Sequence, residues 1–281
     1  MRQHRLVLCT PEHEPSPLVQ TVWSTMRHEA ASVASREPVL ARLIDEQILR
    51  HVCFAEALTA VIALRLAVPT LDSWMLSDLI RDVLEEEPAI IDAAAYDLAA
   101  IRDRDPACPD LLTPMLYFKG YQSLQAYRVS HRLWQMDKTH LARHLQSRIS
   151  EVFGVDIHPA ARMGRGILID HATALVIGET AVVEDDVSIL HGVTLGGTGK
   201  QCGDRHPKIR RGVLLGAGST VLGNIEVGEG AKIGAGAVVL TPIEPFTTAA
   251  GVPARMIGPK LTTAAALTME QTLPMMIDVG I

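Results

Sequence analysis

A histidine and two aspartates in the second half of the chain could carry out general acid–base chemistry. His171 directly follows Asp170, and Asp156 precedes both in the chain. An imidazole titrates near neutral pH, so His171 is a candidate general base. A carboxylate such as that of Asp156 can orient an imidazole and stabilise its cationic form. The same residues are also compatible with a solvated surface histidine and a simple turn aspartate.

A second polar cluster, Asp204-Arg205-His206-Pro207, follows a glycine-rich stretch. The planar guanidinium of Arg205 is suited to binding a carboxylate through two hydrogen bonds. An ion pair that anchors the loop would use the same residues. The preceding segment 196–200 resembles a phosphate-binding loop but lacks the spacing of a P-loop, so it is a weak signal for a nucleotide.

Two other chemistries fit the residues less well. Zinc enzymes that are built from six-residue repeats use three histidines at a fixed spacing. The histidines at 158, 171, 191 and 206 do not have this spacing, so no metal is expected. Cys202 is a rival covalent nucleophile because it lies close to the polar loop.

Aliphatic residues recur at every sixth position across the second half of the chain, with one two-residue shift and one longer break. The series is Ile157, Met163, Ile169, Leu175, Ile177, Val183, Ile189, Leu195, Ile209, Leu215, Val221, Val227, Ile233 and Val239. A fixed period is the signature of a repeat architecture. Each hexad is expected to form a short strand and a corner of a triangular parallel β-helix, whose coils stack through backbone hydrogen bonds.

The corners of this β-helix should need left-handed backbone angles, which glycine adopts at low cost. Glycine directly follows several aliphatic positions, at Gly164, Gly178, Gly196, Gly216, Gly228 and Gly234. The break before Ile209 predicts a loop over 197–208, where functional residues would be presented. On this frame His171 faces outward, and Asp156 lies one coil below it, offset by half a side.

The first half of the chain is expected to be helical. All but one of the 21 glycines lie at or beyond Gly154, and only Phe153 and Phe246 among the aromatic residues lie beyond residue 140. This uneven use places a domain boundary near 150–155. Apolar spacing and breakers predict helices over 22–37, 39–68, 71–87, 89–102 and 137–154, and another that Thr113 caps and that runs to 135.

The predicted organisation is therefore an α+β multidomain fold, an all-α helical domain followed by a left-handed parallel β-helix of hexapeptide repeats. Its parts are an N-terminal tail (1–20), the helical domain (21–153), the β-helix (154–258) with its loop 197–208, and a flexible C-terminal tail (259–281).

Composition excludes several classes of protein. The 281 residues are 48% hydrophobic and 21% charged, which argues against long disorder, and a net charge of −6 argues against a general nucleic-acid binder. No apolar run reaches the roughly 18–20 residues of a membrane span. We expect no signal peptide, and the four cysteines are too sparse for a disulfide framework. A cytoplasmic location is therefore expected.

Several segments resemble the serine O-acetyltransferase family of hexapeptide-repeat acyltransferases. They include Asp156-Ile-His-Pro, Ile169-Asp-His-Ala-Thr, Gly203-Asp-Arg-His-Pro-Lys and Gly251-Val-Pro-Ala-Arg, with Arg104-Asp-Pro-Ala and Leu116-Tyr-Phe-Lys-Gly upstream. The likeness covers about residues 75–257. The loop around Arg205 and the hexad around His171 are much more specific than the repeat itself.

The resemblance implies transfer of an acetyl group from acetyl-CoA to L-serine in cysteine biosynthesis, by direct attack without an acyl-enzyme. By position, His171 and Asp156 match the general base and its carboxylate partner. The acidic residues Asp105 and Asp170 match residues that bind the substrate, through its ammonium group.

The resemblance also implies how the two substrates are held. Arg205 and His206 match the loop residues that bind the serine carboxylate. Acetyl-CoA is a co-substrate rather than a permanent cofactor, and it is expected in a groove between neighbouring subunits, near Gly197, Thr198, Ala217, Lys232, Ala235 and Arg255.

The implied partners are other copies of the chain, a feedback inhibitor and a second enzyme. The resemblance implies a trimer or a dimer of trimers, and L-cysteine as an inhibitor that competes with serine. A C-terminal Ile281 after an acidic residue is similar to the peptide that docks into O-acetylserine sulfhydrylase. Neither nucleic acid nor membrane is expected as a partner.

Two rival functions remain at this point. One is acetyl transfer to another acceptor, such as a sugar or homoserine, and the other is a non-catalytic scaffold that binds the sulfhydrylase through Ile281. The acidic residues with Arg205 favour an amino acid, which offers an ammonium and a carboxylate group, and intact Asp156 and His171 argue against the scaffold.

Overall fold

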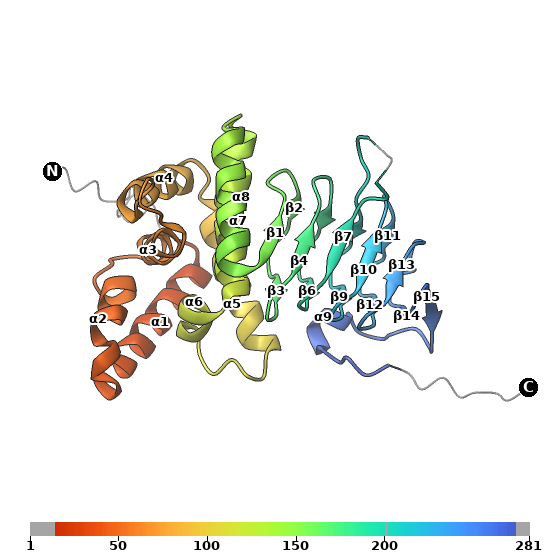
Figure 1. Cartoon of the computed structure of the whole chain (residues 1–281). Helices are drawn as coiled ribbons and strands as arrows, with labels where there is room; N and C mark the ends of the chain where they lie inside the picture. The colour runs from red at the N-terminus through yellow and green to blue at the C-terminus, as the bar shows by residue number, and fades with distance from the viewer. Residues whose placement is uncertain (1–14, 200–201, 274–281) are drawn as a thin grey trace, which may run out of the picture. The chain divides into compact units, whose positions relative to one another are not determined.

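The computed structural model describes residues 15–199 and 202–273 (Figure 1). The chain divides into two units, residues 1–152 and 153–281. The first contains α-helices and the second parallel strands, which confirms the expected fold class.

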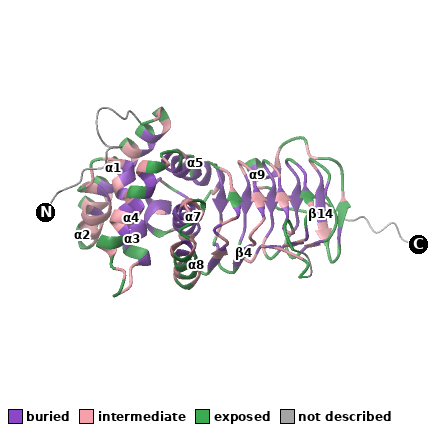
Figure 2. Cartoon of the chain, turned by 90° about the horizontal axis from the view of Figure 1, so that it is seen from above, coloured by how far each residue is buried: buried purple, intermediate pink, exposed green. Residues whose placement is uncertain are grey.

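The first unit contains helices that bury one or more apolar faces (Figure 2). They are α1 (Pro17–Arg36), η2 (Pro38–Leu40), α2 (Ala41–Ile44), η3 (Asp45–Leu49), α3 (Phe54–Leu66), α4 (Ser73–Glu86), α5 (Ala89–Arg104), α6 (Leu112–Tyr117), α7 (Lys119–Gln135) and α8 (Thr139–Phe153). α1 begins inside the expected N-terminal tail because the Ser16 hydroxyl accepts a hydrogen bond from the main-chain N–H of Val19.

The prediction of one long helix over 39–68 is wrong. The chain winds into a π-helical turn, in which Arg50 N–H bonds to Asp45 O at 3.1 Å, and it breaks before α3. Side chains of α1 bind the carbonyl groups that the break leaves free. Trp23 Nε1 donates to Val52 O at 3.3 Å and Arg27 to His51 O at 2.9 Å.

The helix predicted from Thr113 to residue 135 is likewise two helices, α6 and α7. The carboxylate of Asp110, not Thr113, caps the first, since it accepts the Thr113 N–H at 2.7 Å. At the break, the Gln122 side chain donates to the carbonyl oxygens of Met115 and Leu116, at 3.0 and 2.8 Å. Side chains thus satisfy the backbone groups at both interruptions.

Of the cysteines that the structure describes, Cys108 and Cys202 are free thiols. Among the described residues no single helix is long and apolar enough to cross a membrane, although the bent pair Pro38–Leu49 and Phe54–Leu66 reaches that length and composition.

A buried ion pair ties α5 to α7. Arg128 Nη2 donates to Asp97 Oδ2 at 2.7 Å, and the Asp97 side chain is fully buried. Gln125 donates to the same oxygen at 2.9 Å and accepts from Arg128 Nε at 3.2 Å. Because buried charges are costly unless paired, each member depends on the others.

The second unit is a parallel β-solenoid of three sheets. The first sheet contains β1 (Val155–Ile157), β4 (Leu175–Ile177), β7 (Thr194–Gly196), β10 (Thr220–Leu222) and β13 (Val238–Val239). The second contains β2 (Arg162–Met163), β5 (Val182–Val183), β8 (Lys208–Ile209) and β11 (Glu226–Val227). The third contains β3 (Leu168–Ile169), β6 (Ser188–Ile189), β9 (Leu214–Leu215), β12 (Lys232–Ile233), β14 (Thr248–Gly251) and the antiparallel β15 (Ala254–Ile257).

The predicted aliphatic series forms stacked ladders in the solenoid core. On the first sheet Ile157, Ile177, Leu195, Val221 and Val239 lie in register, each almost fully buried. The other sheets carry equivalent ladders, in which Met163 alone of the predicted positions is half-buried. The aliphatic positions predicted from the six-residue period are therefore the positions that pair between stacked coils.

The glycines that follow the aliphatic positions have a different role from the one expected. None of them has a left-handed φ angle, which belongs to other glycines such as Gly192 and Gly218. They leave room between coils: a Cβ atom at Gly216 would lie 2.6 Å from Ala235 N, and one at Gly228 2.5 Å from Pro245 N. Close approach of backbones, not a left-handed corner, excludes a side chain here.

The C-terminal segment packs against the third sheet as far as residue 273, instead of forming a free tail. Its short helix α9 (Ala265–Thr268) places Ala265 against Leu190 and Leu214. The main-chain N–H of Ala266 bonds to Gly212 O at 3.0 Å, and Ser188 Oγ bonds to Ala266 O at 3.2 Å.

We predict that Asp97→Ala lowers the free energy of unfolding of the helical unit by about 3–5 kcal/mol, because it leaves the Arg128 guanidinium buried without its carboxylate. Denaturant unfolding followed by circular dichroism measures this. Asp103→Ala, which removes an exposed partner of Arg102 on the same helix, serves as the control and should change stability by less than about 1 kcal/mol. Equal effects of the two variants would contradict the prediction.

Candidate active site

His171 lies in the turn that joins β3 to β4, and its backbone is strained. His171, Ala172 and Ala174 have φ angles of 56°, 60° and 61°, a left-handed region that costs residues other than glycine about 1–2 kcal/mol each. Ala172 is fully buried, and Asp170 N–H bonds to Ile189 O at 2.8 Å, so the neighbouring coil holds the turn. The His171 side chain points outward and is 75% exposed. Strain held by buried neighbours is typical of functional sites.

The predicted carboxylate partner, Asp156, and the predicted substrate-binding residue, Asp170, lie differently relative to His171. Asp170 Oδ1 is 3.8 Å from His171 Nε2. Asp156 pairs in register with Val176 on β4, the strand that follows the His171 turn, and its half-buried side chain alternates with two buried neighbours. The expected half-side offset is therefore wrong. The two-residue shift lengthens the first coil, so that Val155 pairs with Leu175.

The His171 turn belongs to a stack of turns, which we call the entry edge because the chain enters the first sheet there. Successive coils are joined by bonds of 2.8 Å, from Gly192 N–H to Thr173 O, from Gly218 N–H to His191 O and from Gly236 N–H to Ala217 O. The edge therefore brings Ala217 and Ala235, which were predicted to contact acetyl-CoA, into line with His171.

His191 also lies on the entry edge, although sequence reasoning gave it no role. Its ring meets the His171 ring edge-on, with centroids 5.8 Å apart. The repeat register could have predicted this contact, because Ile169 pairs with Ile189 and each histidine follows its isoleucine by two positions.

Arg205 and His206 lie where the chain leaves the first sheet, which we call the exit edge. Arg205 Nη2 donates to Glu179 Oε2 at 2.6 Å, and this bond holds the pKa of the Glu179 carboxyl below its ordinary value. The ion pair was one of the two alternatives for this loop. It fixes the guanidinium on one side while further N–H groups remain for another acceptor.

The ring of His206 is packed into the exit edge, with the residue only 7% exposed. Burial, followed by the positive charge of Arg205, lowers the pKa of His206 below its ordinary value. The ring depends on a missing side chain, because a Cβ atom at Gly178 would lie 2.0 Å from His206 Nε2. Gly178 is therefore a site residue. In the sequence it looks like the other glycines that follow the aliphatic positions of the repeat.

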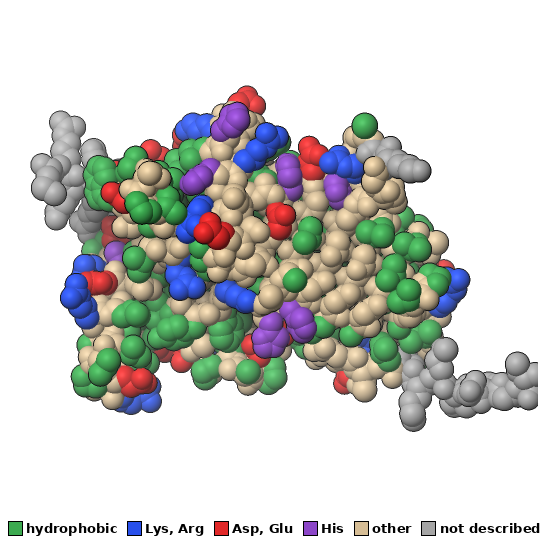
Figure 3. Space-filling view, in the orientation of Figure 1, with side chains coloured by type: hydrophobic (Ala, Val, Ile, Leu, Met, Phe, Trp, Pro, Cys, Tyr) green, Lys and Arg blue, Asp and Glu red, His purple; other side chains and the backbone are tan. Residues whose placement is uncertain are grey.

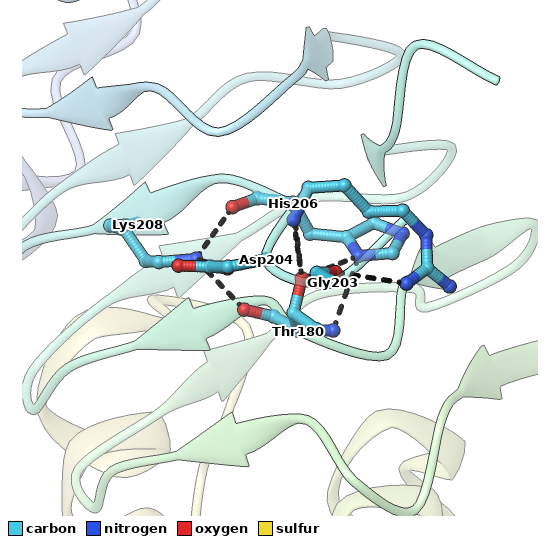
Figure 4. A network of polar contacts seen from close by, with 6 residues as sticks. Thr180, Gly203, Asp204, His206 and Lys208 are labelled. Carbon is cyan, nitrogen blue, oxygen red and sulfur yellow. Dashed lines mark hydrogen bonds and ion pairs between the residues drawn. The ribbon is translucent and has the colours of Figure 1, made fainter. Parts of the chain in front are cut away.

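Two further residues of the exit edge escaped sequence reasoning. Thr180 bonds to Arg205, His206 and Lys208 (Figure 4). His158 also lies close enough to Glu179 to help lower the pKa of that carboxyl. Both lie in corners that follow strands of the first sheet, and only the paired register makes them neighbours of the loop.

The predicted base and the predicted carboxylate-binding pair therefore lie at opposite edges of one sheet. Figure 3 shows histidine side chains at two opposite margins of the solenoid face. The strand β4 alone, which runs from the His171 turn toward Glu179, spans roughly 10 Å. Within one chain His171 and Arg205 are not brought together.

The other predicted acetyl-CoA contacts are scattered. Gly197 and Thr198 follow β7 at the exit edge, and Arg255 lies exposed on β15. Lys232 on β12 is 5% exposed, and its ammonium group donates to the carbonyl oxygens of Glu270 and Thr272, at 3.2 and 2.7 Å. The C-terminal segment thus takes up two of the three donors of Lys232 in this structure.

The remaining predicted residues are Asp105 and Ile281. Asp105 belongs to the helical unit, where its carboxylate accepts the Ala107 N–H at 2.8 Å and holds the turn after α5. Ile281 lies outside the described residues, so its docking role stays a prediction. Within the described part of the chain, no group of three or more His, Cys, Asp and Glu residues could hold a metal ion.

Comparison with known proteins identifies both units. A model of the N-terminal region of serine acetyltransferases matches residues 22–126, and a model of the bacterial transferase hexapeptide repeat matches residues 206–241. The serine acetyltransferase of Salmonella typhimurium is 50% identical over 257 residues, covering 92% of this chain and 94% of that protein.

Two similar solved structures hold ligands. A serine acetyltransferase in complex with cysteine is 49% identical, with a TM-score of 0.89 over 91% of this chain and 99% of that one. The Brucella abortus serine acetyltransferase in complex with coenzyme A is 47% identical, with a TM-score of 0.86 over 88% of this chain and all of that one. Because half of its residues are identical to those of a serine acetyltransferase over 92% of its length, and the N-terminal model of these enzymes matches residues 22–126, the chain belongs to the serine acetyltransferase family.

Proposed function

We propose that this chain transfers the acetyl group of acetyl-CoA directly to the hydroxyl group of L-serine, giving O-acetyl-L-serine and CoA. The observation that carries the proposal is the exposed imidazole of His171, held in a strained turn on the entry edge of a chain 50% identical to a serine acetyltransferase. A solved relative with coenzyme A bound supports acetyl-CoA as the co-substrate.

The proposed mechanism follows from the acidity of the reacting groups. A serine hydroxyl is far too weak an acid to ionise at neutral pH, so it needs a base during attack. His171 accepts the hydroxyl proton while the oxygen attacks the thioester carbonyl. The C–S bond then breaks, and the imidazolium returns the proton to the departing thiolate of CoA. Asp156 orients the imidazole and stabilises its cationic form.

The acceptor would be recognised through both of its charged groups. Arg205 and His206 offer N–H donors to the carboxylate of serine, and Asp170 and Asp105 offer carboxylates to its ammonium group. Free cysteine has the same two charged groups, and a relative has been solved in complex with cysteine. We propose that L-cysteine competes for this site as a feedback inhibitor.

A second copy of the chain would complete the site. His171 lies at the entry edge and Arg205 at the exit edge of one sheet, so a serine held by Arg205 meets the imidazole of a neighbouring subunit. A cyclic trimer satisfies this arrangement three times with one type of contact. The acetyl-CoA groove would then lie between subunits, along Ala217 and Ala235.

We predict that His171→Ala lowers kcat by about 10²–10⁴-fold, because it removes the general base, while the oligomer persists. CoA release from acetyl-CoA, followed with a thiol reagent, measures this with L-serine, homoserine or a simple sugar as acceptor. His144→Ala, which removes an exposed imidazole from α8, is the control and should keep parental activity. Normal turnover by the His171 variant would show that His171 is not the general base. Release with another acceptor and not with serine would overturn the proposed substrate.

We predict that mixing two inactive variants, His171→Ala and Arg205→Ala, restores serine-dependent turnover. After dissociation and random reassembly of the subunits, about a quarter of the shared sites would combine an intact His171 with an intact Arg205. The two variants reassembled separately are the controls and should stay inactive. A mixture as inactive as its components would show that one chain supplies both residues.

A further inference from the structure

Thr180 places its main-chain N–H and its hydroxyl group against a single nitrogen atom of His206 (Figure 4). The main-chain N–H of Thr180 donates to Nδ1 at 3.1 Å, and the Thr180 hydroxyl oxygen lies 2.9 Å from the same atom. A main-chain N–H can only donate, so Nδ1 must hold its lone pair and the ring hydrogen must lie on Nε2. Thr180 thereby selects one of the two neutral tautomers of His206.

The same hydroxyl group also holds the backbone of the loop. The main-chain N–H groups of Arg205 and His206 donate to Thr180 Oγ1, at 3.0 and 3.1 Å. These two bonds use both lone pairs of the hydroxyl oxygen, so the hydroxyl hydrogen is donated, and Nδ1 of His206 and the carboxylate of Asp204 are the acceptors within reach. The Thr180 side chain therefore sets the positions of two consecutive residues, while the main-chain N–H of Thr180 sets the tautomer of His206.

Lys208 reinforces this arrangement from the other side. Its ammonium group donates to Thr180 O at 2.9 Å, to His206 O at 2.8 Å and to Asp204 Oδ1 at 2.6 Å. The Lys208 bond holds the pKa of the Asp204 carboxyl below its ordinary value. The loop thus returns to the solenoid on fixed hydrogen bonds to Thr180 and Lys208.

The ring nitrogen that carries the hydrogen lies over Gly178, where a Cβ atom would come within 2.0 Å of it. The charged and titratable groups that face His206 are Arg205, Glu179, Lys208 and His158. The carboxylates of Glu179 and Asp204 pair with Arg205 and Lys208, so an anion would be bound through the N–H groups of Arg205 other than those bonded to Glu179 and Gly203.

We propose that Thr180 is a positioning residue for the amino-acid acceptor, which holds His206 and Arg205 so that the Nε2–H group and the guanidinium together bind the acceptor's carboxylate. This inference rests on the proposed function, because it deepens the role given there to Arg205 and His206. A site built to donate hydrogen bonds to a carboxylate discriminates strongly against an acceptor that lacks one.

The test compares Thr180→Val, which keeps the shape and loses the hydroxyl, with Thr180→Ser, which keeps the hydroxyl. Thr220→Val on β10, outside this network, is the matched control. We expect Thr180→Val to raise the KM for serine about tenfold, with the KM for acetyl-CoA and kcat changed less than about threefold. Thr180→Ser and Thr220→Val should stay within about twofold of the parent.

The pH profile separates positioning from a general loss of structure. Protonation of His206 places a hydrogen on Nδ1, where it opposes the Thr180 donors, so the KM for serine should rise as the pH falls through the pKa of His206. Burial and Arg205 lower that pKa, and Thr180→Val removes one donor to the neutral ring. We therefore expect the acidic rise in KM to begin at higher pH in Thr180→Val than in the parent.

The outcomes are distinguishable from failure of the proposed function. If the parent shows no serine-dependent CoA release, the proposed function fails, and the role of Thr180 fails with it. If the parent is active, three results overturn the inference alone: an unchanged KM for serine in Thr180→Val, an equal rise in the KM for both substrates, or a Thr180→Ser variant as impaired as Thr180→Val.

Discussion

The stacking of aliphatic side chains in the solenoid core is the interaction on which the rest of the second unit depends. Ile177 and Leu195 pair in register, and so every turn above and below them is placed at a defined height. A slip by one residue would move buried side chains to the surface, so the register is strongly specified. His171, His191 and the Arg205 loop occupy positions that this register assigns.

The same constraint explains what the sequence could predict. A narrow core accepts aliphatic side chains at one position in six, and this requirement is visible in a single chain without any structure. The loop over 197–208 was visible as the break in that series. The outward direction of His171 followed from its place in the hexad and is observed, with its side chain 75% exposed.

Other features depend on contacts between distant segments, which spacing does not encode. The break before α3 requires Trp23 and Arg27 of another helix to bind the freed carbonyl groups. Thr180 and Gly178 look like ordinary repeat residues until the returning loop is placed against them. The role expected for the glycines that follow the aliphatic positions was wrong. Close approach between coils and a left-handed φ angle both require glycine, so the sequence does not distinguish them.

The loop that carries Arg205 leaves and rejoins the solenoid without disturbing it. Val183 pairs with Ile209 across the insertion just as it pairs with Met163 in the coil below. The pairing of the strands therefore does not depend on the length of the loop. The length and the residues of this segment can therefore change while every coil, the entry edge and the imidazole of His171 stay where they are. The exit edge can thus vary in evolution independently of the entry edge within one architecture.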